Sequence, residues 1–513
     1  MLRDYLIKKL NGVFYKRDEP QSQSPLSDEI KISGYLNTNL EIVRKITKNC
    51  SDVIIREFLM GNIRAAVIYI DGLVNTLSVD QTVIKTLMYG TDDNCEPCCI
   101  DEIINKLIVS GEIKKVNTVN DGFEGFLSGD TFLMADGIKE GLIINTKGFE
   151  KRSVDDPQTD SVISGSREGF IENIRTNTAL LRRRIKSVSL CVENIKIGRE
   201  TKTAVDIIYL ENVANSELIS EIKRRLIKID IDGILDSGYL QYFLDDNPKS
   251  VFSLVDSTEK PDIAAAKILE GRAAVVVDGS PFVLTAPMYF GESFQSPEDY
   301  YIHSVAATML RVIRYLSFFV SILALPAYVA LTTFHQELIP TQLLYTMAAA
   351  ESGTPFASFI EALMMTVVFE ILKEAGVRLP KPVGQAVSIV GALVIGETAV
   401  SAGLIGAPMV IAVSITAVTA FVTPAQANTI VLLRYILLVL SAVLGGFGIT
   451  VGLLGILIHL MSLKSFGTPY LAPLAPLRIS DLKDTVFLAP VRARLTRPHG
   501  LSRKNPIRQK LSD

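Results

Sequence analysis

The chain has 513 residues, of which 48% are hydrophobic and 21% charged, so it is too apolar for an ordinary soluble enzyme of this length. Residues 315–463 contain only four Lys and Arg and six Asp and Glu, which excludes a soluble domain there and predicts several membrane spans. The formal net charge of −3 carries no basic excess, so we expect no nucleic-acid partner.

Residues 1–29 are predicted to form a flexible leader, because this stretch ends in a polar segment rich in Pro and Ser. Charged residues interrupt the N-terminal apolar run within a few positions, so we expect no signal peptide. The odd number of cysteines, five, argues against a disulfide scaffold and for a reducing compartment. Cys95, Cys98 and Cys99 have the spacing of half a zinc site without a second pair, so we expect neither metal nor cofactor.

Two similar α/β lobes are predicted, at residues 30–145 and 167–297, with a linker at 146–166 and a cleft between the lobes. Two pairs of segments align without gaps at nearly the same offset: VIYIDGLVN (67–75) with IIYLENVAN (207–215), and GDTFLMADG (129–137) with GRAAVVVDG (271–279). Both later segments are β-rich runs that end in Asp-Gly, a strong hairpin signal. Matched segments at almost constant spacing indicate a duplicated unit.

The second lobe is predicted to open with a helix at residues 167–186 that carries a basic cluster. The cluster consists of Arg182, Arg183, Arg184 and Lys186. Such a cluster can meet anionic lipid headgroups or a partner, and a solvated helix face explains it equally well.

A multipass helical membrane domain is predicted over residues 312–463, followed by a basic tail at 464–513. Prolines and rare charges divide it into spans at 312–333, 356–372, 383–403 and 405–422, and two more within 429–463. The last stretch is too long for one crossing, so we expect a break at residues 445–448. Because Lys and Arg flank only one side, the positive-inside rule places both termini in the cytosol with six crossings. Four full spans plus half-helices is the alternative.

The sequence contains no nucleotide-binding, metalloprotease or serine-hydrolase motif, so we expect no enzyme. Charges inside the apolar segments are more informative, because charge there faces protein or water rather than lipid. Glu370 has further charges on the next turn, which indicates an ordinary position at the membrane interface. Glu361 is a weaker candidate for a polar pathway than Glu397 and a stronger one than Glu370. Glu397 is the strongest candidate for a polar pathway, the alternative being an ion pair with Arg434.

Small residues predict close approach of the helices in two places, because lipid provides no hydrophobic drive for helix association. They are Gly384, Ser388 and Gly391 in the third span, and Gly448 and Gly452 in the last. The pattern favours a tight bundle or a homo-oligomer.

The third span suggests an ion pathway. On a helix, Val387, Val394 and Thr398 share one face, with Val390 and Glu397 beside it. A ring of such helices would stack apolar valine collars next to an acidic ring that favours cations. The competing interpretation is that this face packs on neighbouring helices.

Several long segments resemble one family, the A subunits of bacterial spore nutrient germinant receptors, over about residues 160–490. The matching segments are GSREGFIENIRTNTALLRRRIKS (165–187), DGILDSGYLQYFLDD (232–246), EKPDIAAAKILEGRAAVVVDGSPFVLTAP (259–287), FHQELIPTQLL (334–344), PFASFIEALMMTVVFEILKEAGVRLP (355–380), GQAVSIVGALVIGETAV (384–400) and SFGTPYLAPLAP (465–476).

The resemblance implies an α+β membrane protein, with a two-lobed cytosolic α/β domain before a multipass helical domain, in the inner spore membrane. It further implies a transporter-like B subunit that binds the nutrient, a lipoprotein C subunit, and a homo-oligomeric ring, a pentamer, that releases cations as a nutrient-gated channel. The alternative is a non-conducting scaffold that couples the B subunit to downstream effectors.

Overall fold

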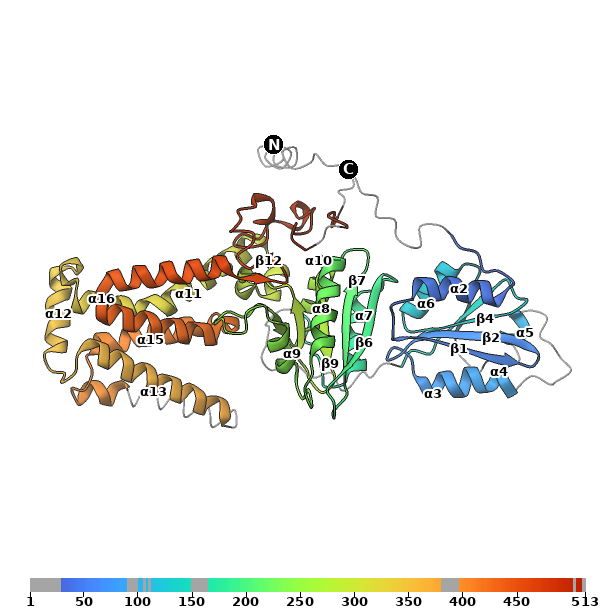
Figure 1. Cartoon of the computed structure of the whole chain (residues 1–513), viewed down its shortest axis with the longest axis horizontal. Helices are drawn as coiled ribbons and strands as arrows, with labels where there is room; N and C mark the ends of the chain where they lie inside the picture. The colour runs from blue at the N-terminus through green and yellow to red at the C-terminus, as the bar shows by residue number, and fades with distance from the viewer. Residues whose placement is uncertain are drawn as a thin grey trace.

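Two five-stranded sheets and a set of long helices follow one another along the chain and along the long axis of the molecule (Figure 1). The computed structural model describes residues 29–89, 100–104, 108, 112–148, 165–379, 396–501 and 504–509. The first lobe lies at one end, the second lobe lies in the middle, and the helical region occupies the other end.

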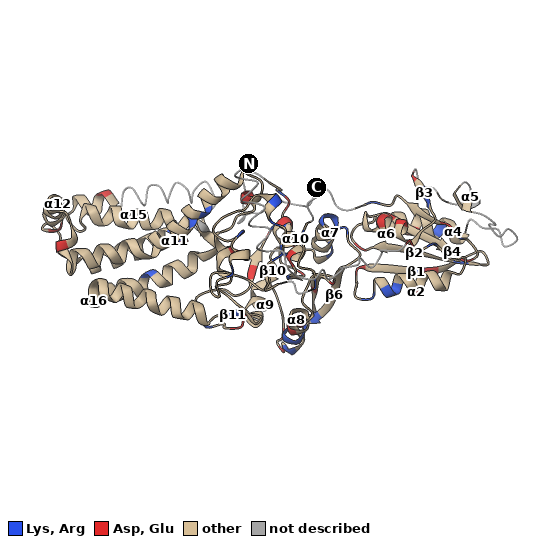
Figure 2. Ribbon diagram, turned by 90° about the horizontal axis from the view of Figure 1, so that it is seen from above, with Lys and Arg blue, Asp and Glu red and all other residues tan. Residues whose placement is uncertain are grey.

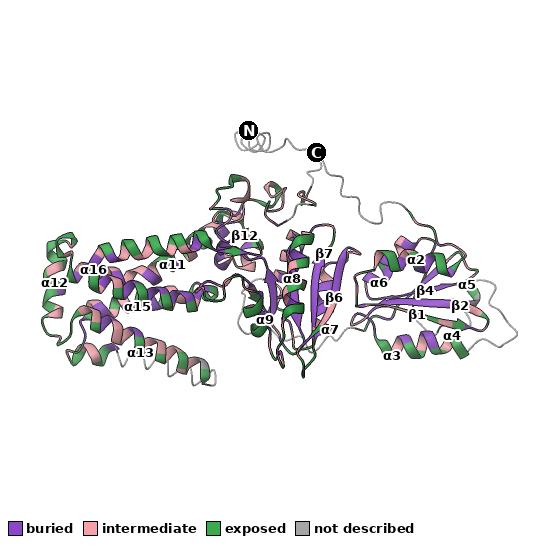
Figure 3. Ribbon diagram, in the orientation of Figure 1, coloured by how far each residue is buried: buried purple, intermediate pink, exposed green. Residues whose placement is uncertain are grey.

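The first lobe is a sheet in the order β1-β2-β4-β5-β3 with helices on both faces. Its strands are β1 (Val53–Met60), β2 (Ile63–Ile70), β3 (Ile113–Val116), β4 (Thr131–Ala135) and β5 (Gly141–Ile144). One face is covered by α2 (Leu36–Ile46) and α6 (Val119–Leu127), the other by α3 (Thr76–Ser78), a π-helical turn (Val79–Ile84), α4 (Lys85–Tyr89) and α5 (Ile100–Glu102). Successive strand residues point to opposite faces of the sheet. Because helices cover both faces, apolar strand residues are buried on each side (Figure 3).

The second lobe repeats this arrangement, with strand order β6-β7-β9-β10-β8. Its strands are β6 (Leu190–Ile197), β7 (Thr203–Leu210), β8 (Asp256–Thr258), β9 (Ala273–Val277) and β10 (Val283–Ala286). The helices α7 (Ile174–Arg184) and α10 (Pro261–Glu270) cover one face, and α8 (Ser216–Lys228) and α9 (Ser237–Leu244) cover the other. The two pairs of aligned segments fall on equivalent strands, β2 with β7 and β4 with β9.

Small polar details also recur at equivalent places in the two lobes. The side-chain amide of Asn39 bonds both the N–H and the carbonyl of Ser33, and Asn177 bonds Ile171 in the same way. The Asp136 carboxylate accepts from the first N–H of α2, and the Asp278 carboxylate accepts from the first N–H of α7. The repetition therefore extends from strand order to side-chain capping.

The two lobes meet through a buried ion pair rather than an open basic surface. Arg182 donates two hydrogen bonds, of 2.7 and 2.9 Å, to the Asp52 carboxylate, and neither side chain is more than 1% exposed. The expectation that Arg182 belongs to a lipid-binding or solvated cluster is therefore wrong, because α7 turns it toward the first lobe. Beside this pair, a hydrogen bond with Cys191 lowers the pKa of Cys50 to about 7, and Arg182 acts in the same direction.

The helical region begins at the second lobe and returns to it. Its helices are α11 (Ser304–Thr333), α12 (Thr341–Glu351), α13 (Ser358–Arg378), α15 (Ala407–Phe421) and α16 (Ala427–Ser462). The short α12 lies at the end farthest from the lobes (Figure 1). Within the described residues, α11 and the segment Pro424–Ser462 are long and apolar enough to cross a membrane, and α15 is apolar but shorter. Few charges lie on these helices compared with the lobes (Figure 2).

A sharp break divides α16 at the expected place. Gly445 has φ 59° and ψ −139°, which is not helical, so the chain folds back into two helices there. The Gly446 N–H donates to His335 Nε2 at 3.1 Å, which satisfies a free N–H at the start of the second half. Gly448 and Gly452 lie where the halves touch: a Cβ on Gly448 would be 2.1 Å from the Leu440 carbonyl oxygen.

The remaining expected spans correspond less closely to the helices. The span predicted at 356–372 overlaps α13, which begins at Ser358 and carries several charges, and the one at 405–422 contains the short α15. Most of the span at 383–403 lies outside the described residues, which resume at residue 396.

The basic tail folds back onto the second lobe. Two short strands, β11 (Lys464–Ser465) and β12 (Thr468–Pro469), follow α16 directly. The Phe290 N–H donates to the Tyr470 carbonyl, and the Lys504 ammonium donates to the Glu211 carbonyl. The tail is therefore part of the folded structure, and the helical region starts and ends at the same lobe.

The close contact at Gly448 predicts that a single added methyl group lowers the stability of the protein. Gly448→Ala would force its Cβ into the backbone of the first half, so we expect at least about 2 kcal/mol of destabilisation from overpacking. Gly455→Ala is the matched control, because nothing lies within 4 Å of the added Cβ. Thermal unfolding of the purified full chain in detergent measures both, and equal melting temperatures for the two variants would contradict the hairpin.

Candidate functional site

Most of the predicted pathway lies outside the described residues. This holds for Val387, Val390 and Val394 and for the packing residues Gly384, Ser388 and Gly391. Glu397 and Thr398 are described, and both are exposed on a short helix at residues 396–401. Within the described part of the chain, no hydrogen bond or ion pair reaches the Glu397 carboxylate.

Glu361 is the acidic residue that the helices bury most completely. It lies on the first turn of α13 and is 1% exposed. Its Oε2 accepts from the Gly406 N–H at 3.2 Å, immediately before α15. The carboxylate therefore caps the start of α15 and joins two helices, which favours a negative group at that position.

A second acid lies at the same far end of the helical region. The Tyr328 hydroxyl donates to Glu351 Oε1 at 3.0 Å, and the Ser358 hydroxyl donates to the same oxygen at 3.4 Å. These contacts tie the end of α12 to α11 and to the start of α13. The sequence pattern alone did not identify this role of Glu351.

Arg434 is buried in the first half of α16 and pairs with Glu370, not with Glu397. The distance from Arg434 Nη2 to Glu370 Oε1 is 2.8 Å, and the Arg434 side chain is 3% exposed. Lys373 adds a contact of 2.7 Å to the other oxygen of Glu370. The alternative interpretation, a Glu397–Arg434 pair, is wrong, because α13 places Glu370 at Arg434. Glu370 is therefore not an ordinary residue but the partner of a buried arginine.

A charged cluster joins the base of α11 to the second lobe and the tail; we name it the junction cluster. It consists of Asp299, Arg311, Arg314, Asp484 and Arg494. Asp299 and Arg311 are both fully buried, and their side chains meet at 2.8 Å. Arg314 Nη1 lies 2.8 Å from the same carboxylate, one turn farther along α11.

The tail completes the junction cluster from the other side. Arg311 Nη1 donates to Asp484 Oδ1 at 2.8 Å, and the Tyr300 hydroxyl lies 3.1 Å from the same oxygen. Arg494 lies 3.7 Å from Asp484 Oδ2. Burial is the main reason that the pKa of Tyr300 is raised, so its hydroxyl stays protonated and can donate.

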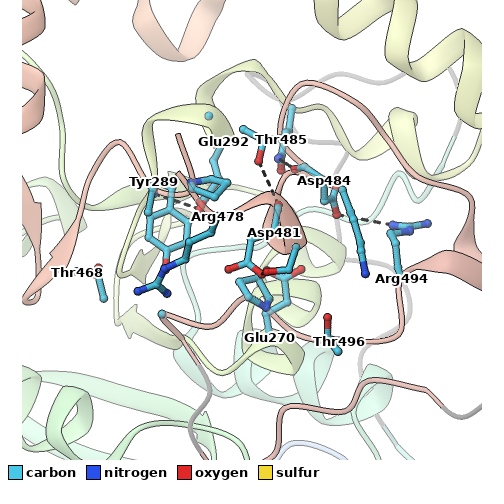
Figure 4. A pocket seen from close by; sticks show the side chains of 18 of the residues that line it. Glu270, Tyr289, Glu292, Thr468, Arg478, Asp481, Asp484, Thr485, Arg494 and Thr496 are labelled. Carbon is cyan, nitrogen blue, oxygen red and sulfur yellow. Dashed lines mark hydrogen bonds and ion pairs between the residues drawn. The ribbon is translucent and has the colours of Figure 1, made fainter. Parts of the chain in front are cut away.

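Two neighbouring cavities adjoin the junction cluster. The smaller, of about 120 Å³, lies between the second lobe and the tail and is lined by Glu270, Tyr289 and Asp481 among others (Figure 4). The larger, of about 660 Å³, reaches Arg314 and Val422 at the ends of the helices. Glu292 contacts Arg272 at their edge, and burial raises the pKa of Glu270. Acids and bases are paired around both cavities, so no single ligand charge is favoured.

The pattern of basic residues beside the predicted spans did not identify Arg311 and Arg314 as members of a charged cluster. The available signal was Asp299, which lies twelve and fifteen residues before them in a segment that also contains two tyrosines. Asp484 gave no signal, since its contact with Arg311 spans 173 residues.

Comparison with known proteins shows that the chain is similar to spore germination proteins over most of its length. Residues 41–500 match the GerA family, described as the Bacillus/Clostridium GerA spore germination protein. The chain is 43% identical to spore germination protein KA of Bacillus subtilis (strain 168), over 94% of this chain and 89% of that protein. It is 36% identical to spore germination protein GerLA of Bacillus cereus, over 93% and 97% of the two chains.

Among solved structures, the chain is similar to the crystal structure of the N-terminal domain of the A subunit of the Bacillus megaterium spore germinant receptor GerK3. It is 33% identical, with a TM-score of 0.41, and covers 51% of this chain and 98% of that chain.

The Glu370–Arg434 pair predicts that the stability of the protein falls when only one of the two charges is removed. Glu370→Gln leaves Arg434 buried without its carboxylate, so we expect destabilisation of roughly 3 kcal/mol. Adding Arg434→Gln should recover most of this loss. Glu374→Gln is the control, because Glu374 makes an exposed pair with Arg378. Melting temperatures of the four proteins test the pair, and no recovery in the double variant would refute it.

The junction cluster predicts that Asp484 holds the tail in place. Asp484→Ala removes the acceptor for Arg311 and Tyr300, each hydrogen bond to a charged group being worth about 1.5–3 kcal/mol. We expect faster thermolysin cleavage within residues 478–509 of the full chain. Arg492→Ala, at an exposed neighbour, should leave the rate unchanged. Equal rates for both variants would show that the tail docks without this cluster.

Proposed function

The chain belongs to the GerA family of spore germinant receptor A subunits, and from this premise we propose that it is a membrane subunit that releases cations during spore germination. The family membership rests on a match over most of the chain.

We propose that the helical region crosses the membrane an even number of times, six by the sequence prediction, with both termini in the cytosol. The supporting observation is that α11 leaves the second lobe and the tail after α16 returns to it. Each half of α16 has 17 or 18 residues, about 25–27 Å of helix, which suits one crossing of a bilayer with a hydrocarbon core of about 30 Å.

The observation that carries the channel proposal is the contrast between Glu397 and three acids on the long helices and α12, namely Glu351, Glu361 and Glu370. Glu361, Glu351 and Glu370 are all held by groups of this chain. Glu397 is exposed on an otherwise apolar segment and has no partner among the described residues. A charge in that position favours a water-filled path or a neighbouring subunit over lipid.

We therefore propose a homo-oligomeric ring, a pentamer by family resemblance, in which Glu397 and Thr398 face a central path. Val387, Val390 and Val394 would form apolar collars that close by dewetting, and the acidic ring would favour cations. Gly384, Ser388 and Gly391 would allow the helices to approach closely. The trigger would be nutrient binding to a transporter-like B subunit, with a lipoprotein C subunit as the third component, in the inner spore membrane.

A second function, a non-conducting scaffold that transmits a signal from the B subunit, is favoured by the junction cluster. Asp299 and Asp484 connect the lobe and the tail to the first turns of α11 through buried charges. Such a rigid connection would carry movement between the helices and the cytosolic lobes whether or not ions flow.

The two functions differ in the behaviour of the valine variants. In the channel, Val390→Ala or Val394→Ala widens a collar, so spores with normal amounts of protein should lose ions without nutrient. If the valines only pack, the same changes cost about 0.5–2 kcal/mol of stability and lower the amount of assembled protein without a leak. Normal dormancy at full abundance in both variants would remove this span from the gate.

Glu397 gives the matching test of selectivity. Glu397→Gln keeps the shape of the side chain and removes its charge, so currents in planar bilayers should show a lower preference for cations over anions. Glu337→Gln is the control, because Glu337 is exposed in the loop after α11. Currents with unchanged selectivity would place the path elsewhere, and no current with or without the partners would favour the scaffold.

A further inference from the structure

Helix α9 of the second lobe is apolar on two opposite sides. Leu240 and Leu244 point into the core of the lobe and are fully buried. The other side carries Tyr239, Tyr242 and Phe243 at i, i+3 and i+4, exposed by 43%, 62% and 40%, and Leu235 just before the helix is 68% exposed. We name these four residues the aromatic face of α9.

The segment that follows α9 is fastened to the ends of the transmembrane candidates. The Ser250 hydroxyl lies 3.0 Å from His459 Nε2, in the last turn of α16. The Thr429 hydroxyl, at the first turn of α16, donates to the Val251 carbonyl at 2.8 Å. Figures 1 and 2 both show α9 on the side of the second lobe that faces the helices. The aromatic face therefore lies near the level at which these helices end.

The charges around α9 suit a lipid surface. No charged residue occurs within α9 itself, and the flanking acids are engaged inside the protein. Asp236 accepts from Gly238 and Ser280, Asp245 accepts from Asn247 and Leu254, and Asp246 pairs with Arg225. The side chains of Lys249 and Lys464, near α9 and at the end of α16, are exposed.

We propose that the aromatic face of α9 lies in the headgroup layer of the membrane that the helices cross, with Lys249 and Lys464 beside anionic headgroups. Tyrosine and phenylalanine suit this layer because their rings are apolar while the tyrosine hydroxyl stays hydrated. The charges that would accompany such an interfacial helix come from Lys249 and Lys464 beside α9, since α9 itself carries none. The inference rests on the proposed membrane insertion of the helical region.

Such an anchor gives the second lobe a fixed height and tilt at the membrane. The lobe would then be held at two places, the junction cluster at the base of α11 and the aromatic face of α9. Movement of the helices would reach the sheet through both.

Photo-crosslinking of the full chain in vesicles of phosphatidylethanolamine and phosphatidylglycerol tests this. A benzophenone amino acid replaces one residue at a time: Tyr242→benzoylphenylalanine, the matched exposed tyrosine Tyr35→benzoylphenylalanine in the first lobe, and Leu457→benzoylphenylalanine on the exposed side of α16. Mass spectrometry then identifies the adducts. We expect lipid adducts at positions 242 and 457 and none at 35.

Each other outcome overturns the inference in a distinguishable way. Lipid adducts at 457 without any at 242 would leave the membrane subunit intact and refute the anchor. Crosslinks from 242 to a second copy of the chain, without lipid adducts, would assign the aromatic face to a contact between subunits. Absence of lipid adducts at 457 would refute membrane insertion of the helices as well as the anchor.

Discussion

The fully buried pair of Asp299 and Arg311 is the constraint on which the rest of the arrangement depends. Removing both charges from water is costly, and the further contacts with Arg314 and Asp484 offset part of that cost. Asp299 belongs to the connection after the second lobe, Arg311 to the first helix, and Asp484 to the tail. One cluster therefore fixes the beginning of the helical region and the segment that follows its end on the same lobe.

This constraint determines how the helices can be placed in a membrane. In the proposed membrane arrangement, a helical region that starts and ends at one lobe crosses an even number of times. The break at Gly445 supplies the final return, and His335 satisfies the N–H that the break exposes. The close approach of Gly448 to Leu440 lets the two halves pack without a bulky side chain between them. The far end, with α12 and the acids Glu351 and Glu361, then lies away from both lobes.

The sequence predicted those features that depend on local pattern. The aligned segments lie on equivalent strands, and the Gly-rich stretch lies at the break in α16. Both were predictable because the spacing of apolar residues and the glycine content depend on local structure. Long-range partners were not predictable in the same way. Arg434 meets Glu370 across 64 residues, and Arg182 meets Asp52 across 130, so neither pairing leaves a trace in spacing. The valine collars remain a prediction, since their residues lie outside the described part of the chain.

The position of the far end relative to the membrane is the most direct test of this account. Single cysteines introduced as Glu337→Cys, Gly353→Cys or Lys464→Cys would be probed with a membrane-impermeant maleimide on intact cells that express the full chain. The account predicts labelling at 337 and 353 only, with Lys464→Cys and all five native cysteines protected in intact cells. Lys464→Cys, whose position is exposed, becomes labelled once the membrane is opened. Labelling of Lys464→Cys in intact cells, or protection of all three positions, would contradict it.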